Sequence, residues 1–175
     1  VVPPNGMLSP LRCTEGTVSL PAQLPVQLPV GVPLVINGGG QDCLRAEGQC
    51  SIALNLGDRN LTLTNCERCI QAGGNADVSL TTTGTLSCTA SEDGILAQGT
   101  ASVRLAATSL TIMGGEHGVH AAGTAEVGLD APTCTISGDE GPERIDGNAT
   151  IDSCTTQVVV PPNGMLSPLR CTEGT

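Results

Sequence analysis

The sequence predicts an all-β fold, a right-handed parallel β-helix (β-solenoid), from three observations. Apolar and polar residues alternate in short runs, as they do in half-buried strands. The runs recur every 24–26 residues, a length typical of one solenoid coil. The chain also contains 23 glycines and 12 prolines, which disfavour long helices. Because parallel crossovers are right-handed by strong preference, we expect the coil to be right-handed.

Each predicted coil contains three short strands. The clearest strand reads Gly-x-Ala-x-Val-x-Leu with its alternate residues facing inward, and its copies begin at Gly48, Gly74, Gly99, Gly123 and Gly147. A shortened copy begins at Gly16. Before each copy comes an apolar marker residue, and the markers are Leu11, Leu44, Ile70, Ile95, Val119 and Ile145. A third strand follows each copy, with its last example at 158–160. Stacked coils should lie about 4.8 Å apart.

A longer repeat encloses the coils. Residues 1–17 recur unchanged as residues 159–175, an offset of 158. This identity predicts a tandem array in which 1–158 is one complete repeat unit and 159–175 starts the next identical unit. The spacings between successive coil markers add up to the same 158 residues, so about six coils fill one unit. The coils of the next unit then continue with the same spacing. We therefore expect one continuous solenoid.

Two proline-rich insertions, 3–10 and 21–33, interrupt the rhythm. Prolines cannot donate to a strand ladder, so the longer insertion should leave the solenoid as an extended loop. Its regularly spaced prolines are Pro21, Pro25, Pro29 and Pro33. One interpretation is a tolerated insertion in one coil. The other is a docking strap, or a site of proline hydroxylation and glycosylation, displayed once per unit.

Composition limits both the core and the partners. The chain has no Phe, Tyr or Trp, so Val, Ile, Leu, Ala and Cys must fill a narrow interior. The formal net charge of −10 argues against nucleic-acid and anionic-membrane partners. No apolar run reaches 18 residues, so we expect no membrane contact by this segment.

The cysteines and two glycosylation sequons favour a secreted, disulfide-bonded glycoprotein. One unit holds eight cysteines, an even number, and the sequon residues Asn60 and Asn148 fall on outward positions. Cys66-x-x-Cys69 has no second pair at zinc-finger spacing, which favours a disulfide over a metal site. We expect the pairs Cys43–Cys69, Cys66–Cys88, Cys13–Cys50 and Cys134–Cys154.

Catalysis is the less favoured class. His117 and His120 are three residues apart, so in a regular strand they point to opposite faces and cannot chelate one metal. The other candidates for acid, base or charge stabilisation are Glu116, Asp139, Glu140, Arg144 and Asp146. Right-handed β-helices include pectin-cleaving enzymes with grooves of acidic, basic and aromatic residues. This chain lacks aromatic residues for sugar stacking and a convergent acid pair, so we expect no enzyme and no cofactor.

Hydroxyl side chains on the third strands predict two outward rows on one flat face. The paired positions are Thr62 and Thr64, Thr85 and Ser87, Ser109 and Thr111, and Thr133 and Thr135. The rows resemble those of β-solenoid ice-binding proteins. Threonine also suits strands in general, and this simpler interpretation is favoured.

The coil pattern resembles the parallel β-helix repeats of large secreted proteins. Together with the long units, cysteines, sequons and prolines, it resembles the axial protein of green-algal mastigonemes, the hairs on cilia. That resemblance implies a very long, proline-glycosylated scaffold coated by a second glycoprotein. Bacterial fibrous adhesins are similar in fold.

We therefore expect a structural repeat of a secreted filament or of a ciliary or cell-surface appendage. Its partners would be neighbouring units of the same chain, a coating filament glycoprotein and attached glycans. The alternative is an ice-binding or adhesin-type solenoid.

Overall fold

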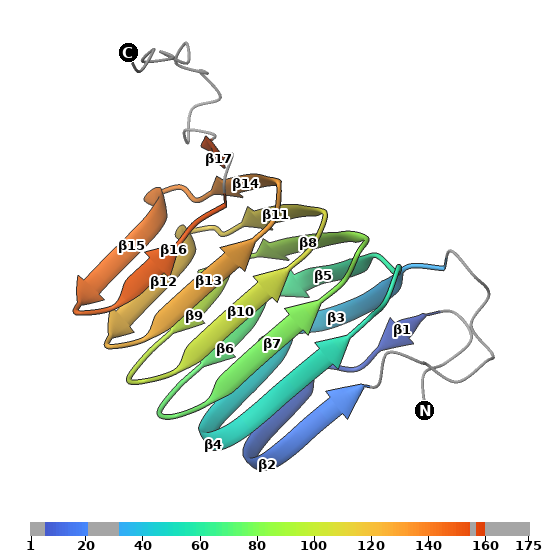
Figure 1. Ribbon diagram of the computed structural model, residues 1–175, viewed down its shortest axis with the longest axis horizontal. Helices are drawn as coiled ribbons and strands as arrows, with labels where there is room; N and C mark the ends of the chain where they lie inside the picture. The colour runs from blue at the N-terminus through green and yellow to red at the C-terminus, as the bar shows by residue number, and fades with distance from the viewer. Residues whose placement is uncertain (1–5, 21–31, 155–156, 160–175) are drawn as a thin grey trace.

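The computed structural model describes residues 6–20, 32–154 and 157–159. These residues form an all-β structure of seventeen strands with no helix. All strand pairings are parallel, and the strands form a β-solenoid of about five turns. Figure 1 shows the chain winding as a right-handed coil, as the crossover rule predicts. None of the described residues belongs to a helix with the length and hydrophobicity that a bilayer span requires.

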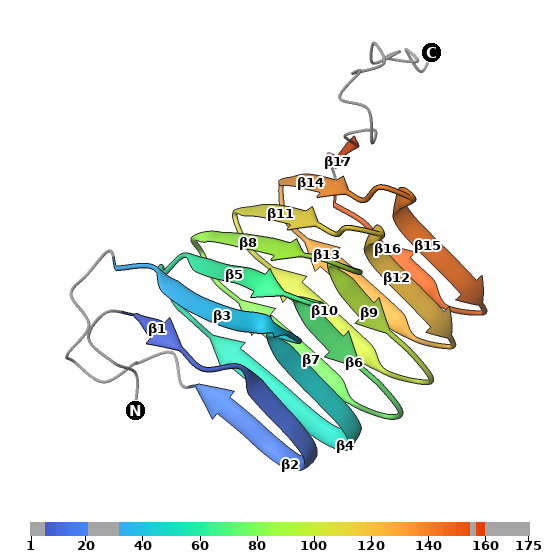
Figure 2. The ribbon, with the colours of Figure 1, turned by 180° about the vertical axis from the view of Figure 1, so that it is seen from behind.

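The third strands of the coils form a seven-stranded sheet on one side of the solenoid (Figure 2). In order, its strands are β1 (Met7–Leu8), β3 (Leu34–Gln41), β5 (Leu61–Cys66), β8 (Thr85–Ala90), β11 (Ser109–Met113), β14 (Thr133–Ser137) and β17 (Gln157–Val159). The strands alternate between buried and outward residues, for example along β11. The sheet therefore has one face toward the core and one flat outer face.

A ten-stranded sheet forms the two remaining sides. One row contains β15 (Gly141–Gly147), β12 (His117–Gly123), β9 (Ile95–Ala97) and β6 (Ile70–Ala72). The other row contains β7 (Asp77–Thr81), β10 (Ser102–Ala106), β13 (Glu126–Asp130) and β16 (Thr150–Asp152). The long strands β2 (Leu11–Leu20) and β4 (Leu44–Asn55) join the rows, because β6 pairs with the start of β4 and β7 with its end. Each coil is consequently three-sided (Figure 1).

The register of the strands confirms the repeat that the sequence predicts. Along the Gly-x-Ala-x-Val-x-Leu strands, the column of β-branched residues runs from Ile52 through Val78, Val103 and Val127 to Ile151. The expected break in the coils also appears, since β2 ends at Leu20 and β3 begins at Leu34. Equivalent residues therefore stack directly on one another along the solenoid axis.

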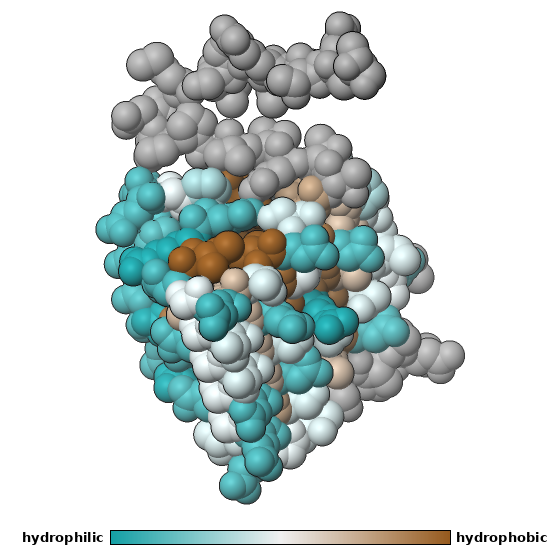
Figure 3. All heavy atoms as spheres, turned by 60° about the vertical axis from the view of Figure 1, so that its left-hand side comes forward, coloured by the Kyte–Doolittle hydropathy of each residue, from teal (hydrophilic) through white to brown (hydrophobic). Residues whose placement is uncertain are grey.

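The core is a thin column of aliphatic side chains. All twelve of the largest fully buried side chains in the described part are leucines or isoleucines. Alanines and cysteines fill the remaining inward positions, for example Ala46, Ala72, Ala97 and Ala121. Figure 3 shows that the surface at the β12 and β15 side is mostly hydrophilic, with one brown apolar patch. The exposed large apolar side chains of the described residues are Met7, Met113 and Ile145.

Glycine is required at the corner between the two rows of the ten-stranded sheet. Gly48, Gly74, Gly99, Gly123 and Gly147 stack there, each with a φ between 67° and 78°. A Cβ on Gly99 would lie 3.0 Å from the carbonyl oxygen of Gly74, and Thr100 donates its backbone N–H to that same oxygen at 2.8 Å. The left-handed conformation and the close coil spacing both exclude a side chain here.

The register corrects two predictions for the last described coil. Val119 pairs with Glu143, and Ile145 pairs with Ala121, so Ile145 is not the marker of its coil. Because strand side chains alternate with a period of two, a shift of two residues keeps the same face and the pattern alone cannot detect it. The final third strand is also displaced, since Gln157 rather than Val158 pairs with Cys134.

The same coil places polar groups at the end of the core. Glu143 is aligned with the buried Val119, and the hydroxyl of Ser153 donates to Glu143 Oε1 at 2.5 Å. Ile145, aligned with the fully buried Ala121, is 52% exposed. Within the described residues, the apolar interior therefore gives way to a mixed polar and apolar surface at this coil.

The glycine corner gives a direct test of the fold. Gly99→Ala should lower the free energy of unfolding by about 1–2 kcal/mol or more, because a Cβ is disfavoured at positive φ and would contact the coil below. The measurement is urea unfolding followed by circular dichroism.

Gly128→Ala is the matched control for this substitution. Its added Cβ would meet nothing closer than Arg104 Cγ at 4.0 Å, so its stability should be unchanged or slightly higher. Equal losses in both variants would contradict the close stacking of the glycine corner.

Candidate functional site

Charged side chains gather at the corner where the seven-stranded sheet passes into the β6, β9 and β12 row. Four of them occupy equivalent positions in successive coils, because each lies two residues before a buried residue that pairs with its counterpart in the neighbouring coil. They are Asp42, Arg68, Asp93 and His117. These four stacked residues are called the corner column below. Asp42, Asp93 and His117 are at most 6% exposed. Buried polar groups of this kind require partners, and the column supplies them from coil to coil.

Arg68 connects three acidic side chains in the first part of the column. Its Nη1 lies 3.5 Å from Asp42 Oδ1, and its Nη2 lies 3.2 Å from Glu67 Oε1 and also contacts Glu92 Oε2. Arg45 approaches Asp42 from the other side, with Nη1 3.5 Å from Oδ2. One guanidinium therefore bridges coils that would otherwise bring acidic groups together.

Burial decides the protonation behaviour of Asp42. Removal from water raises the pKa of its carboxyl above the ordinary value, and the attraction of Arg68 and Arg45 only partly opposes this rise. For Arg68, burial acts against the charge, but the hydrogen bond and attraction of Glu92 leave the pKa raised. The guanidinium thus stays charged while the neighbouring carboxyl is easier to protonate than a free aspartate.

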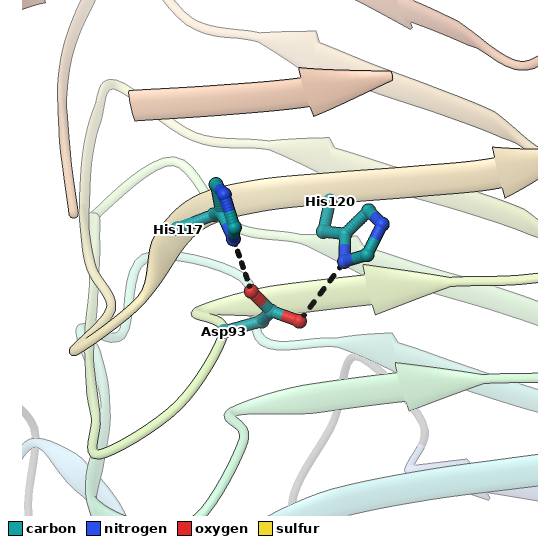
Figure 4. A group of neighbouring side chains, drawn as sticks. All are labelled: Asp93, His117 and His120. Atoms are coloured by element: carbon teal, nitrogen blue, oxygen red, sulfur yellow. Dashed lines mark hydrogen bonds and ion pairs between the residues drawn. The ribbon is translucent and has the colours of Figure 1, made fainter. Parts of the chain in front are cut away.

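The second part of the column is a cluster of two histidines around one carboxylate (Figure 4). Asp93 Oδ1 lies 3.0 Å from His117 Nδ1, and Asp93 Oδ2 lies 3.2 Å from His120 Nδ1. The side chains of Asp93 and His117 are each 7% exposed, and that of His120 is 14% exposed. Asp93 precedes β9, whereas both histidines belong to β12 on the next coil. The cluster therefore links two coils.

This convergence corrects the prediction that His117 and His120 point to opposite faces. The prediction assumed a regular strand, but His117, Gly118 and Val119 are all buried, so the alternation fails at the start of β12. Gly118 is packed closely inside β12, where an added Cβ would lie 2.4 Å from Ile136 Cγ2 and 2.7 Å from the Pro142 carbonyl oxygen. A side chain on the corner and one on the adjoining strand can then face the same carboxylate.

Three of the other charged candidates surround the histidines. Asp146 Oδ2 lies 3.0 Å from His120 Nε2, and Glu140 Oε2 lies 3.7 Å from His117 Nε2. Arg144 Nε donates to Asp146 at 2.9 Å. The hydrogen bond with His120, aided by Arg144, lowers the pKa of the Asp146 carboxyl. Glu116 and Asp139 are exposed at the same corner.

Within the part of the chain that the structure describes, four disulfides cross-link the coils. The pairs are Cys13–Cys50, Cys43–Cys66, Cys69–Cys88 and Cys134–Cys154. The first and last pairs coincide with the expected ones. The structure contradicts the expected pairs Cys43–Cys69 and Cys66–Cys88.

The reason for this difference lies in the stacking itself. Cys43 and Cys69 do occupy equivalent positions of neighbouring coils, since the residues that follow them are paired. Side chains at equivalent positions run parallel, whereas a disulfide needs Cβ atoms that converge to about 3.8 Å. Each sulfur instead crosses the corner to a cysteine on a different strand, Cys66 in β5 or Cys88 in β8.

Hydroxyl side chains form rows on the outer face of the seven-stranded sheet, but in a different register from the one expected. Thr62, Ser87, Thr111 and Thr135 are aligned in one row. Thr85, Ser109 and Thr133 form a second row, and Thr133 donates to Ser109 Oγ at 3.3 Å. Thr64 lies outside both rows, because the register pairs Thr62 and not Thr64 with Ser87.

The sequon residues are both exposed. Asn60 lies before β5, where its Oδ1 accepts a hydrogen bond from the Thr85 backbone N–H at 2.8 Å. Asn148 lies at the glycine corner and donates its backbone N–H to the Gly123 carbonyl at 2.7 Å. Of the regularly spaced prolines, Pro33 is described and exposed. Pro21, Pro25 and Pro29 lie outside the described residues, as do 159–175 apart from Val159.

Sequence reasoning missed the corner column. Asp42, Arg68 and Asp93 were not singled out, and the histidines were placed apart. A usable signal was present, because the residues two positions before the markers Leu44, Ile70, Ile95 and Val119 read Asp, Arg, Asp and His. Comparison with protein-family models, curated proteins and solved structures gives no match for this chain.

The raised pKa of Asp42 predicts a pH-dependent effect of Asp42→Asn. The folded protein holds the Asp42 proton more tightly than the unfolded chain, so this contribution to stability is complete below about pH 4 and is lost as the pH rises through the folded pKa. Asparagine does not titrate. The stability of Asp42→Asn relative to the parent should therefore increase with pH across this window, as measured by urea unfolding. A difference that stays constant with pH would contradict the prediction.

Proposed function

We propose that this chain is a structural repeat of a secreted filament or cell-surface appendage, in which successive units build a solenoid rod. The proposal rests on the repetition of residues 1–17 as residues 159–175. The described part of the same chain is a parallel solenoid. Repeats of identical sequence in phase with a coil period extend a structure along one axis. They do not assemble a single site.

The ends of the described solenoid support axial growth. β2 pairs with β4 on one side only, and at the other end β15 and β16 pair only with β12 and β13 within the described residues. A further coil could pair with these edge strands and cover Ile145, which is 52% exposed among the described residues. A neighbouring unit of the same sequence is the partner best matched to these ends.

Cross-links between coils support a mechanical, structural role. Cys13–Cys50, Cys43–Cys66 and Cys69–Cys88 each join different coils, with sequence separations of 19 to 37 residues. Closing loops of this size stabilises a fold by about 3–4 kcal/mol per bond in the chain-entropy model. Four disulfides are also consistent with an extracellular protein.

The finer parts of the proposal concern the surface. Glycans on Asn60 and Asn148, and a coating glycoprotein docked on the proline-rich segment 21–33, would decorate the rod once per unit. A ciliary hair of the mastigoneme type is one such appendage. In this proposal the charged corner has a structural role and the chain is not an enzyme.

The axial repeat of assembled units tests the rod. A chain of several tandem 158-residue units should give a meridional spacing of about 4.8 Å and a unit rise of about 29 Å, because about six coils stack per unit. Cryo-electron microscopy or fibre diffraction measures both values. A much longer rise would show separate domains on linkers and would contradict a continuous rod.

A second candidate function, ice binding, is favoured by the aligned hydroxyl rows. The rows around Thr111 present hydroxyls at a regular spacing of about 4.8 Å on a flat parallel sheet. This function predicts thermal hysteresis by the deglycosylated chain, lost in Thr111→Lys and kept in Ser102→Lys on the β10 side. Absence of hysteresis in the parent chain would remove this candidate.

A further inference from the structure

The cluster of Asp93, His117 and His120 has the donor set of a metal site. One ligand atom from each side chain can be chosen so that all three lie within 4.8 Å of one another. The distances of 3.0 and 3.2 Å from Asp93 oxygens to the two Nδ1 atoms approach the separation between ligands of one tetrahedral ion. Figure 4 shows both imidazole rings directed at the same carboxylate. The three side chains are held by two neighbouring coils and are largely buried.

The outer nitrogens of the rings strengthen this assignment. His120 Nε2 lies 3.0 Å from Asp146, and His117 Nε2 faces Glu140 at 3.7 Å. A neutral imidazole carries one N–H, so a ring that donates from Nε2 presents the Nδ1 lone pair to Asp93. Either a second ring proton or a metal ion must then lie between the nitrogen and the carboxylate oxygen, and two such contacts converge on Asp93. Metal-bound histidines commonly donate their other N–H to a carboxylate in this way.

We propose that Asp93, His117 and His120 bind one divalent transition-metal ion, with Zn²⁺ as the best match. Two imidazole nitrogens and one carboxylate suit zinc and its neighbours, whereas calcium and magnesium prefer oxygen ligands. The ion accepts the Nδ1 lone pairs of the two neutral rings, any proton held between Nδ1 and Asp93 is released to water, and Asp146 and Glu140 fix the orientation of the rings. Three protein ligands leave a fourth position for water.

The position of the site indicates what the ion does. No cysteine occurs between Cys88 and Cys134, so this stretch of the solenoid has no disulfide. Asp93 and the two histidines connect neighbouring coils there with sequence separations of 24 and 27 residues. The four disulfides connect coils over 19 to 37 residues. The ion therefore serves as a cross-link in the part of the solenoid that disulfides leave open.

The two histidines are the only ones in the chain, which makes the test specific. The oxidised 175-residue chain, freed of metal with a chelator, is titrated with Zn²⁺ and followed by calorimetry and by long-range ¹H–¹⁵N spectra of the imidazoles. We expect one ion per chain, a change at both Nδ1 signals, retained protonation at Nε2 and a higher melting temperature. Unchanged imidazole signals on saturation would overturn the proposal.

Variants separate this site from other carboxylates and thiols. Asp93→Asn and His120→Ala should each weaken Zn²⁺ binding by about tenfold or more. Asp42→Asn, a buried aspartate in the same column, and Cys171→Ser should both keep full affinity. If binding survives in Asp93→Asn or is lost in Asp42→Asn or Cys171→Ser, the ion sits elsewhere and the assignment is wrong. Circular dichroism confirms that each variant is folded, and the parent spectra provide a test that needs no variant.

Discussion

The parallel hydrogen-bond ladder between coils is the constraint on which the rest of the structure depends. It stacks equivalent residues at a spacing of about 4.8 Å, so each position in the coil becomes a column along the axis. A side chain must be compatible with the residues directly above and below it. The aliphatic core, the glycine corner and the corner column are three different solutions to that requirement. In each, a residue has at least one partner that lies one coil away.

Stacking of equivalent residues is hardest to accommodate where the stacked side chains are charged. Glu67, Glu92, Glu116 and Glu140 follow one another through backbone hydrogen bonds, so their side chains form an acidic row. Like charges at this spacing repel one another. Arg68 relieves the repulsion at one end, where it contacts two of these glutamates as well as Asp42. At the other end Glu140 faces His117, with Oε2 3.7 Å from Nε2, and a bound ion would place positive charge near the row.

The regular strands could be predicted from the sequence, and the corners could not. Alternation fixed the inward columns from Ile52 to Ile151 and placed Asn60 and Asn148 on the surface. It could not detect shifts of two residues, which is why Ile145 and Thr64 were assigned to the wrong columns. It also failed at the start of β12, where His117, Gly118 and Val119 are all buried, and this failure separated His117 from His120. The disulfide pairs were misassigned because stacking alone does not make side chains converge.

The three corners of the coil differ in how much the chain length can vary. At the glycine corner the spacing from coil to coil is nearly constant, because a left-handed residue must meet its counterpart. At the corner before the seven-stranded sheet, the connection shrinks from 21–33 to 56–60, then 82–84, 107–108 and 131–132. That corner tolerates insertion without altering the register on either side. New segments can therefore be acquired there by the repeat, or introduced by design, while the stacked coils keep their pairing.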